Sequence, residues 1–166
     1  MKKLFLLSAL VAVATTASAK VTLPRIFSDG MVMQQQTEAN LWGDAKANAA
    51  VKITTSWNKK SVVVKADSNG KWSTSFSTPV AGGPYTITLS DGEKTELKNI
   101  LIGELWICSG QSNMEMPMKG FKNQPVENAV EDIFHSGDSQ MRIFTVKRTS
   151  RYAPVDDVVG EWKEAT

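Results

Sequence analysis

One serine of the chain stands where a nucleophile could act. Ser112 lies in the run Gly-Gln-Ser-Asn-Met at residues 110–114, shortly after the apolar run Leu-Trp-Ile-Cys at residues 105–108. Open α/β sheets bind ligands beyond the carboxyl ends of their strands, so a serine there could turn its hydroxyl toward a substrate and its N–H toward an oxyanion. The run is not a nucleophile elbow, because Met114 occupies the second glycine position of that motif. From spacing alone, Ser112 is either a nucleophile or an ordinary turn or cap residue.

The sulfur-containing residues around Ser112 suggest two other chemistries. Cys108 is the only cysteine of the chain. Because it lies inside the apolar run and has no histidine near it in sequence, we expect a buried small hydrophobe, and Cys108 is a weaker candidate than Ser112 for the nucleophile. Met114, Met116 and Met118 could ligate a soft metal, but no histidine or cysteine is arranged to help them. We therefore expect these methionines to pack around the loop, and we expect no metal or organic cofactor.

The elements before this site have the pattern of β-strands. Apolar and polar residues alternate over residues 71–76 and 85–90, and the valine run at residues 62–64 suits a more buried strand. Asn-Gly at residues 69–70 and Asp-Gly at residues 91–92 supply the positive φ angles of tight turns. Short strands with turns between them predict a β-sandwich domain over residues 20–102.

The pattern changes after residue 102. The apolar run at residues 105–108 predicts a strand covered on both faces. Apolar residues at helical spacing over residues 126–134 predict an amphipathic helix, with Pro125 in its first turn and Gly137 as its stop. Residues 141–146 predict a further strand. Residues 103–166 therefore predict the first βαβ unit of an α/β domain, and we expect that domain to be incomplete because a self-standing one needs about 100 residues or more.

The first nineteen residues have the three parts of a secretory signal peptide. Lys2 and Lys3 precede an apolar stretch at residues 4–14, and Ala-Ser-Ala at residues 17–19 is a small-residue cleavage site. A buried N-terminal helix is the alternative. The apolar stretch is shorter than the ~20 residues of a membrane span, and no cysteine follows the cleavage site to carry a lipid anchor. We expect a secreted or periplasmic protein that begins at Lys20.

The charge balance argues against two classes of partner. The chain has 19 Lys and Arg against 17 Asp and Glu, and loss of Lys2 and Lys3 would leave the mature chain formally neutral. No basic field then remains to attract nucleic acid or an anionic membrane surface, so we expect neither as a partner.

The motif around Ser112 resembles a known family. Residues 103–116, Gly-Glu-Leu-Trp-Ile-Cys-Ser-Gly-Gln-Ser-Asn-Met-Glu-Met, closely resemble the first motif of bacterial sialate O-acetylesterases. That family consists of SGNH-type serine hydrolases and is related to some acetylxylan esterases. The resemblance extends upstream to residues 23–34 and 81–85, and downstream to residues 141–146 and 160–162. It therefore covers most of the mature chain in order.

The resemblance implies a role for Ser112 and an SGNH-hydrolase-like fold after residue 102. Ser112 matches the nucleophile, and its backbone N–H matches one oxyanion donor. Gln111, Asn113 and Glu115 lie in the same motif and are candidates for the substrate pocket. In the family, the remaining oxyanion donors and the catalytic aspartate and histidine come later in the chain, and this sequence has no positions that match them.

His135 is the only histidine of the sequence, and Asp132 precedes it with the D-x-x-H spacing of the acid–base pair in SGNH enzymes. On a helical wheel, His135 falls on the side opposite the apolar stripe, toward solvent. A histidine in the last turn of a helix is explained by the helix dipole. We therefore do not predict a catalytic role for this pair.

These residues support three hypotheses about function. In the first, Ser112 attacks an acetyl ester on a sugar, a histidine absent from this chain accepts its proton, and water hydrolyses the acetyl-enzyme. O-acetylated sialic acid is the favoured substrate, with acetylated xylan or another acetylated glycan as alternatives. In the second, the chain is a secreted carbohydrate-binding β-sandwich module without catalysis, although the strand positions of Trp57 and Trp72 favour core packing over sugar stacking. The third concerns this polypeptide rather than its family: we predict that the chain, as a truncated part of the esterase, is inactive by itself because it lacks a general base.

Overall fold

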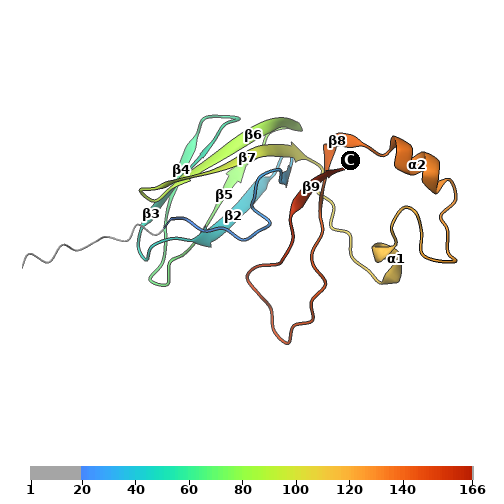
Figure 1. The fold of residues 1–166 in the computed structure, drawn as a ribbon. Helices are drawn as coiled ribbons and strands as arrows, with labels where there is room; N and C mark the ends of the chain where they lie inside the picture. Colours follow the sequence, from blue (N-terminus) through green and yellow to red (C-terminus); the bar gives the residue numbers. More distant parts are fainter. Residues whose placement is uncertain (1–19, 166) are drawn as a thin grey trace, which may run out of the picture.

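The computed structural model describes residues 20–165, so the predicted signal peptide over residues 1–19 lies outside the described residues. Within that range the chain is mostly β-structure with two short helices (Figure 1). In chain order the elements are β1 (Val32–Gln34), β2 (Glu38–Asp44), β3 (Ala50–Thr55), β4 (Ser61–Lys65), β5 (Lys71–Ser77), β6 (Gly82–Ser90), β7 (Lys94–Gly103), α1 (Ser112–Glu115), α2 (Ala129–His135), β8 (Asp138–Phe144) and β9 (Trp162–Ala165). Residues 20–165 contain no helix long and apolar enough to cross a membrane.

The first seven strands form two sheets. The larger sheet has the order β1-β7-β6-β3-β4, with β1 parallel to β7 and the other pairs antiparallel. The smaller sheet pairs β2 with β5 antiparallel. The predicted Asn-Gly and Asp-Gly turns fall before β5 and between β6 and β7, where Gly70 and Gly92 have φ angles of 83° and 120°. The prediction of all-β structure over residues 20–102 is confirmed.

The two sheets contribute to one hydrophobic core. Leu41 and Trp72 of the smaller sheet belong to the same buried cluster as Ile53 and Ile87 of the larger sheet. Burial of each such side chain contributes about 1.5–3 kcal/mol relative to leaving it exposed. Trp72 is only 4% exposed, and Trp57 packs against this core. The prediction that both tryptophans serve the core is confirmed.

The valine run at residues 62–64 does not form a buried strand. It lies in β4, at the edge of the larger sheet, and Val63 is exposed. A β-branched run indicates a strand, but burial depends on which other elements cover its faces. The prediction of a more buried strand was therefore wrong.

The predicted strand over residues 105–108 is not formed. β7 ends at Gly103, and the following segment has no strand partner among the described residues. Trp106 and Ile107 are 81% and 91% exposed. A strand requires a neighbour to accept and donate its backbone hydrogen bonds, and an apolar run does not show whether that neighbour is present.

The predicted helix and the strand after it are formed, with corrections. Asn128 adopts a left-handed conformation with φ 57°, so α2 begins at Ala129 and Pro125 stays outside it. The apolar stripe of α2 is exposed, including Val130 and Phe134. β8 pairs antiparallel with β9. Residues 20–165 therefore contain the helix and the second strand of the predicted βαβ unit, but not a first strand parallel to the second.

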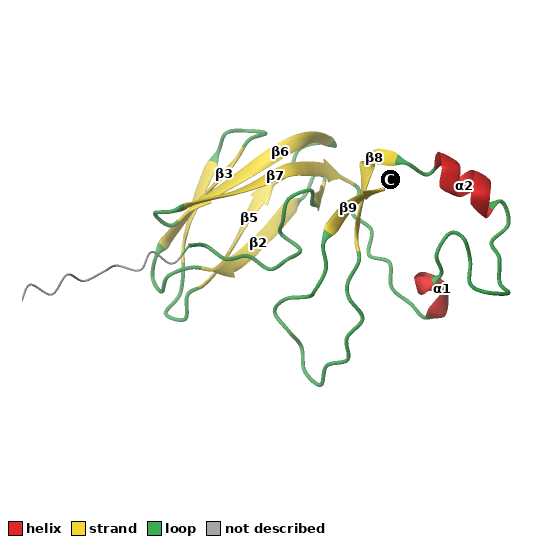
Figure 2. Ribbon diagram, viewed as in Figure 1, coloured by secondary structure: helices red, strands yellow, loops and turns green. Residues whose placement is uncertain are grey.

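The β8–β9 pair is attached to the segment that precedes β1. The indole N–H of Trp162 in β9 donates a hydrogen bond of 2.8 Å to the carbonyl oxygen of Ile26. The rings of Trp162 and Phe144 lie 5.3 Å apart, which joins β9 to β8. Figure 2 shows both helices at the end of the molecule beyond this pair, away from the first seven strands. Ser112 therefore lies on a segment that leaves the β-rich part of the chain after β7.

Candidate active site

Ser112 is the first residue of α1 and is exposed. The turn before it is held by a hydrogen bond of 3.0 Å from the Met114 N–H to the Gln111 carbonyl oxygen. A Cβ at Gly110 would lie 2.7 Å from Cγ of Met114, closer than real contacts allow, so this turn requires glycine unless Met114 moves. A tight turn different from the nucleophile elbow thus presents the Ser112 hydroxyl at the surface.

The predicted pocket residues Gln111, Asn113 and Glu115 surround Ser112 in sequence and are exposed. Gln111 is the N-cap residue of α1, but its side chain makes no capping hydrogen bond. Both carboxylate oxygens of Glu115 accept hydrogen bonds from Nη1 of Arg148, at 3.1 and 3.3 Å. An exposed ion pair of this kind contributes about 0–1 kcal/mol. It joins α1 to the segment that follows β8.

Two glutamines fix the point at which the chain leaves the sheet toward Ser112. Gln35 and Gln34 donate hydrogen bonds of 2.6 and 3.2 Å to the two carboxylate oxygens of Glu104. The Oε1 atom of Gln34 accepts a hydrogen bond of 2.8 Å from the backbone N–H of Leu105. These hydrogen bonds stabilise the charged carboxylate and lower the pKa of Glu104 below its usual value, with the larger effect from Gln35 and the smaller from Gln34.

This cluster of Gln34, Gln35 and Glu104 was missed by the sequence reasoning. Its hydrogen bonds join residues about seventy positions apart, and no local pattern shows such a contact. The available signal was that Gln34 and Glu104 both lie in segments of the family resemblance. The parallel β1–β7 pair brings those two segments together, because Gln34 lies opposite Gly103.

His135 lies in the last turn of α2, as predicted, and is exposed. Its Nδ1 atom is 3.0 Å from the carbonyl oxygen of Glu131 and 3.4 Å from Oε1 of the same residue. Asp132 is also exposed and donates its backbone N–H to the carbonyl oxygen of Asn128. Neither His135 nor Asp132 is hydrogen-bonded to Ser112 in the described part of the chain.

Cys108 is exposed, so the prediction of a buried cysteine was wrong. That prediction depended on a strand at residues 105–108, and because the strand is not formed, the thiol faces solvent. Met114 and Met118 are about half exposed. Across residues 20–165 no group of three or more His, Cys, Asp or Glu side chains is placed to hold a metal ion.

The sequence of the chain was compared with known proteins. Models of known protein families give no match. The chain is 28% identical over 149 residues to the sialate O-acetylesterase of Rattus norvegicus, covering 82% of this chain and 27% of the relative. It is 25% identical over 154 residues to the sialate O-acetylesterase of Homo sapiens, covering 85% of this chain and 28% of the relative.

A solved structure is similar over the same extent. The fold matches the crystal structure of a carbohydrate acetylesterase from Xanthomonas citri with a TM-score of 0.79 and 32% identity. This chain is related to the sialate O-acetylesterases. The alignment covers 88% of this chain and 33% of the Xanthomonas protein. The family resemblance predicted from the motifs is thus confirmed, and the chain spans between a quarter and a third of the relatives that it matches.

Proposed function

We propose that this chain is the N-terminal part of a secreted serine esterase that hydrolyses O-acetyl groups on sugars, with Ser112 as the nucleophile. The observation that carries the proposal is the similarity of more than four-fifths of the chain to proteins named sialate O-acetylesterase and carbohydrate acetylesterase. The exposed turn at Ser112 supports it, because a nucleophile must reach its substrate.

In the proposed mechanism, the Ser112 oxygen attacks the acetyl carbonyl carbon while a general base accepts the hydroxyl proton. The tetrahedral oxyanion that forms accepts a hydrogen bond from the Ser112 N–H, and its collapse releases the sugar hydroxyl. Water then attacks the acetyl-serine, releases acetate and restores the serine. His135, the only histidine of the sequence, contacts Glu131 in α2, so we propose that the general base comes from another segment and that this chain alone is inactive.

We further propose that residues 20–102 form a β-sandwich and that residues 103–166 begin an SGNH-type α/β domain. The core shared by the two sheets supports the first part. The exposed apolar side chains of Trp106, Ile107 and α2 support the second, because such surfaces usually lie against another element.

We propose O-acetylated sialic acid as the substrate, with acetylated xylan or another acetylated glycan as the alternative. The names of the relatives support both, since one group is named for sialate and the Xanthomonas protein for carbohydrate in general. The signal peptide predicted at residues 1–19 supports a secreted or periplasmic location.

Acetate release tests this proposal. The full product of the gene is compared with its Ser112→Ala and Ser150→Ala variants on O-acetylated sialic acid and on acetylxylan. We expect Ser112→Ala to lower kcat by about 10⁴-fold or more, because loss of a nucleophile removes the covalent route. Ser150→Ala, which removes an exposed serine outside the motif, should keep the parent rate. An active Ser112→Ala enzyme would contradict the assignment.

A further inference from the structure

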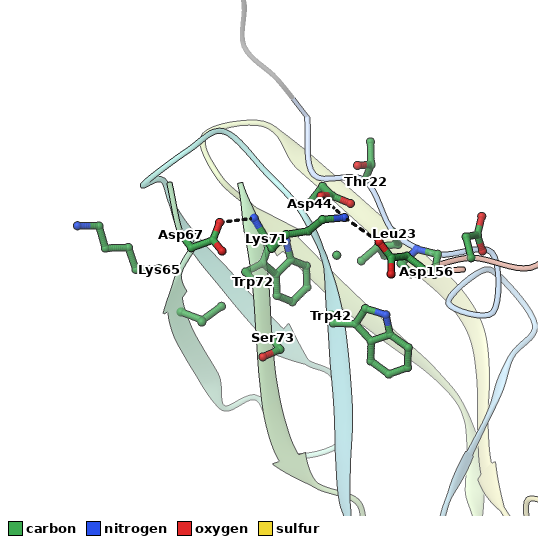
Figure 3. Close-up of a pocket in the computed structure, with 14 residues that line it drawn as sticks. Thr22, Leu23, Trp42, Asp44, Lys65, Asp67, Lys71, Trp72, Ser73 and Asp156 are labelled. Carbon is green, nitrogen blue, oxygen red and sulfur yellow. Dashed lines mark hydrogen bonds and ion pairs between the residues drawn. The ribbon is translucent and has the colours of Figure 1, made fainter. Parts of the chain in front are cut away.

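A hollow far from Ser112 in sequence has the features of a binding site. It has a volume of about 690 Å³ and lies between residues 22–24, strands β2 and β5, and residues 156–157. Figure 3 shows the side chains that line it, with Lys71 between Asp44 and Asp156 and with Trp42 nearby. A concave site with an aromatic surface and a few convergent polar groups is typical of small-molecule binding.

Trp42 supplies the aromatic surface. Its side chain is 42% exposed, whereas its neighbours in β2, Leu41 and Gly43, are buried. The ring of Phe27 packs edge-on against it, with centroids 4.4 Å apart and an angle of 82°, which holds the indole in one orientation. Ser73 lies opposite Trp42 on β5, so the neighbouring side chain is small and polar.

A second hollow continues the first across the same sheet face. It has a volume of about 430 Å³ and shares Trp42 and Ser73 with the first hollow. Asn40 and Ser75, which lie opposite each other on β2 and β5, also line it. The exposed indole is therefore flanked on both sides by hydrogen-bonding groups, which suits a ligand longer than one ring.

Lys71 is the central polar group of the first hollow. Its Nζ atom lies 2.9 Å from Oδ1 of Asp44 and 3.6 Å from Oδ2 of Asp156. All three side chains are about half exposed or more, so each keeps hydrogen-bonding capacity for a ligand. The hydrogen bond and charge of Asp44, with a smaller effect of Asp156, raise the pKa of Lys71, which therefore stays charged at neutral pH.

The loop that carries Asp156 is held in place by its neighbour. Asp157 accepts a hydrogen bond of 2.8 Å from the Arg25 N–H and lies 3.7 Å from Nε of the Arg25 side chain. This contact fixes the loop against the N-terminal segment and places Asp156 beside Lys71.

Charge decides which class of ligand fits. Four carboxylates line the hollow against two lysines, Lys65 and Lys71, so an anionic ligand would be repelled. A neutral ligand with many hydroxyl groups offers both donors and acceptors to such a set, and its apolar C–H face can pack on an indole.

We propose that this hollow binds a neutral saccharide, with Trp42 stacking against a sugar ring and Asp44, Lys71 and Asp156 hydrogen-bonding its hydroxyl groups. We call it the Trp42 site. It does not include Ser112 or the motif around it, so it stands apart from the proposed esterase chemistry. In an enzyme that acts on glycans, it would hold a neutral part of the polymer while another part of the molecule works on the acetylated sugar.

Isothermal titration of the chain with xylotetraose and with lactose tests the proposal, with tryptophan fluorescence as a second readout. We expect saturable binding of at least one of them with a Kd below about 10 mM. Trp42→Ala should weaken that binding by about tenfold or more. Trp106→Ala, which removes another exposed indole outside the site, is the matched control and should bind as the parent does.

Asp156→Asn provides a variant that does not depend on the fold of β2, because Asp156 is an exposed loop residue. We expect it to weaken binding by about threefold. Sialyllactose, an anionic probe, should bind at least about tenfold more weakly than lactose. Absence of binding by both neutral probes, equal binding of sialyllactose, or loss of binding in Trp106→Ala but not in Trp42→Ala would each overturn the proposal. Ser112→Ala should bind as the parent does, so failure of the esterase assignment and failure of the Trp42 site are distinguishable.

Discussion

Gly43 is a position at which a single added methyl group should disturb the fold. A Cβ there would overlap the carbonyl oxygen of Thr22 and would lie 2.9 Å from Cδ2 of Leu23 and 3.2 Å from Cζ2 of Trp72. Thr22 cannot simply move away, because it exchanges two backbone hydrogen bonds of 2.9 Å with Asp44. Gly43→Ala should therefore force the N-terminal segment off β2 or strain the core around Trp72.

The expected cost follows from these contacts. Overpacking of a well-filled interior costs about 1–3 kcal/mol, and each backbone hydrogen bond that is lost adds about 1 kcal/mol. Removing the freedom of glycine from the unfolded chain returns about 0.4–1 kcal/mol. We expect Gly43→Ala to lower the free energy of unfolding by about 2 kcal/mol in all.

Urea unfolding followed by tryptophan fluorescence measures this change. With a slope of roughly 2 kcal/mol/M, the midpoint should fall by about 1 M while the slope stays the same. Gly103→Ala is the matched control, because Gly103 also lies in a strand but a Cβ there meets nothing within 4 Å. Its midpoint should stay within about 0.3 M of the parent. If Gly43→Ala unfolds at the same urea concentration as Gly103→Ala, the close approach of Thr22 to β2 is wrong.

Three further predictions concern the core, the glutamine cluster and the free thiol. Ile87→Ala should lower the free energy of unfolding by about 2–5 kcal/mol in the same urea assay, since Ile87 is fully buried; a change below about 1 kcal/mol would contradict its place in the core. The lowered pKa of Glu104 stabilises the folded chain at neutral pH, and this contribution is lost as the pH falls below the usual value of 4.5 and through the lowered pKa. Glu104→Gln should therefore make urea midpoints less sensitive to pH in that acid range, and an unchanged dependence would argue against the bonds from Gln35 and Gln34. Cys108 should react with a thiol reagent in the folded chain about as fast as in urea. A reaction more than about tenfold slower in the folded chain would show that the thiol is buried after all.

Local chemistry made some of the fold predictable. The Asn-Gly and Asp-Gly turns and the alternation over residues 71–76 and 85–90 are properties of short segments, and the structure has strands and turns at those places. Burial was predicted less well, because it depends on neighbours that a pattern does not show. Residues 105–108 were assigned a strand from apolarity alone, and Cys108 was assigned to the interior with them.

The candidate site was predictable only where a motif marks it. Ser112 came from a contiguous motif, and its exposed position in the structure is compatible with the proposed role. The contacts of Glu104 with Gln34 and Gln35 join distant segments, so no spacing rule could find them. Trp42 was missed for a related reason, because its place opposite Ser73 depends on the pairing of β2 with β5.

The most direct test of the central claim is to locate the acetyl group during turnover. The full product of the gene is mixed with an O-acetylated sugar and quenched in acid within its first turnovers, and its peptides are then measured by mass spectrometry. We expect the mass of one acetyl group on the peptide that contains Ser112, fragmentation that assigns it to that serine, and its absence in Ser112→Ala. An acetyl group on Cys108, or rapid acetate release with no acetyl group on Ser112 at any quench time, would contradict the account.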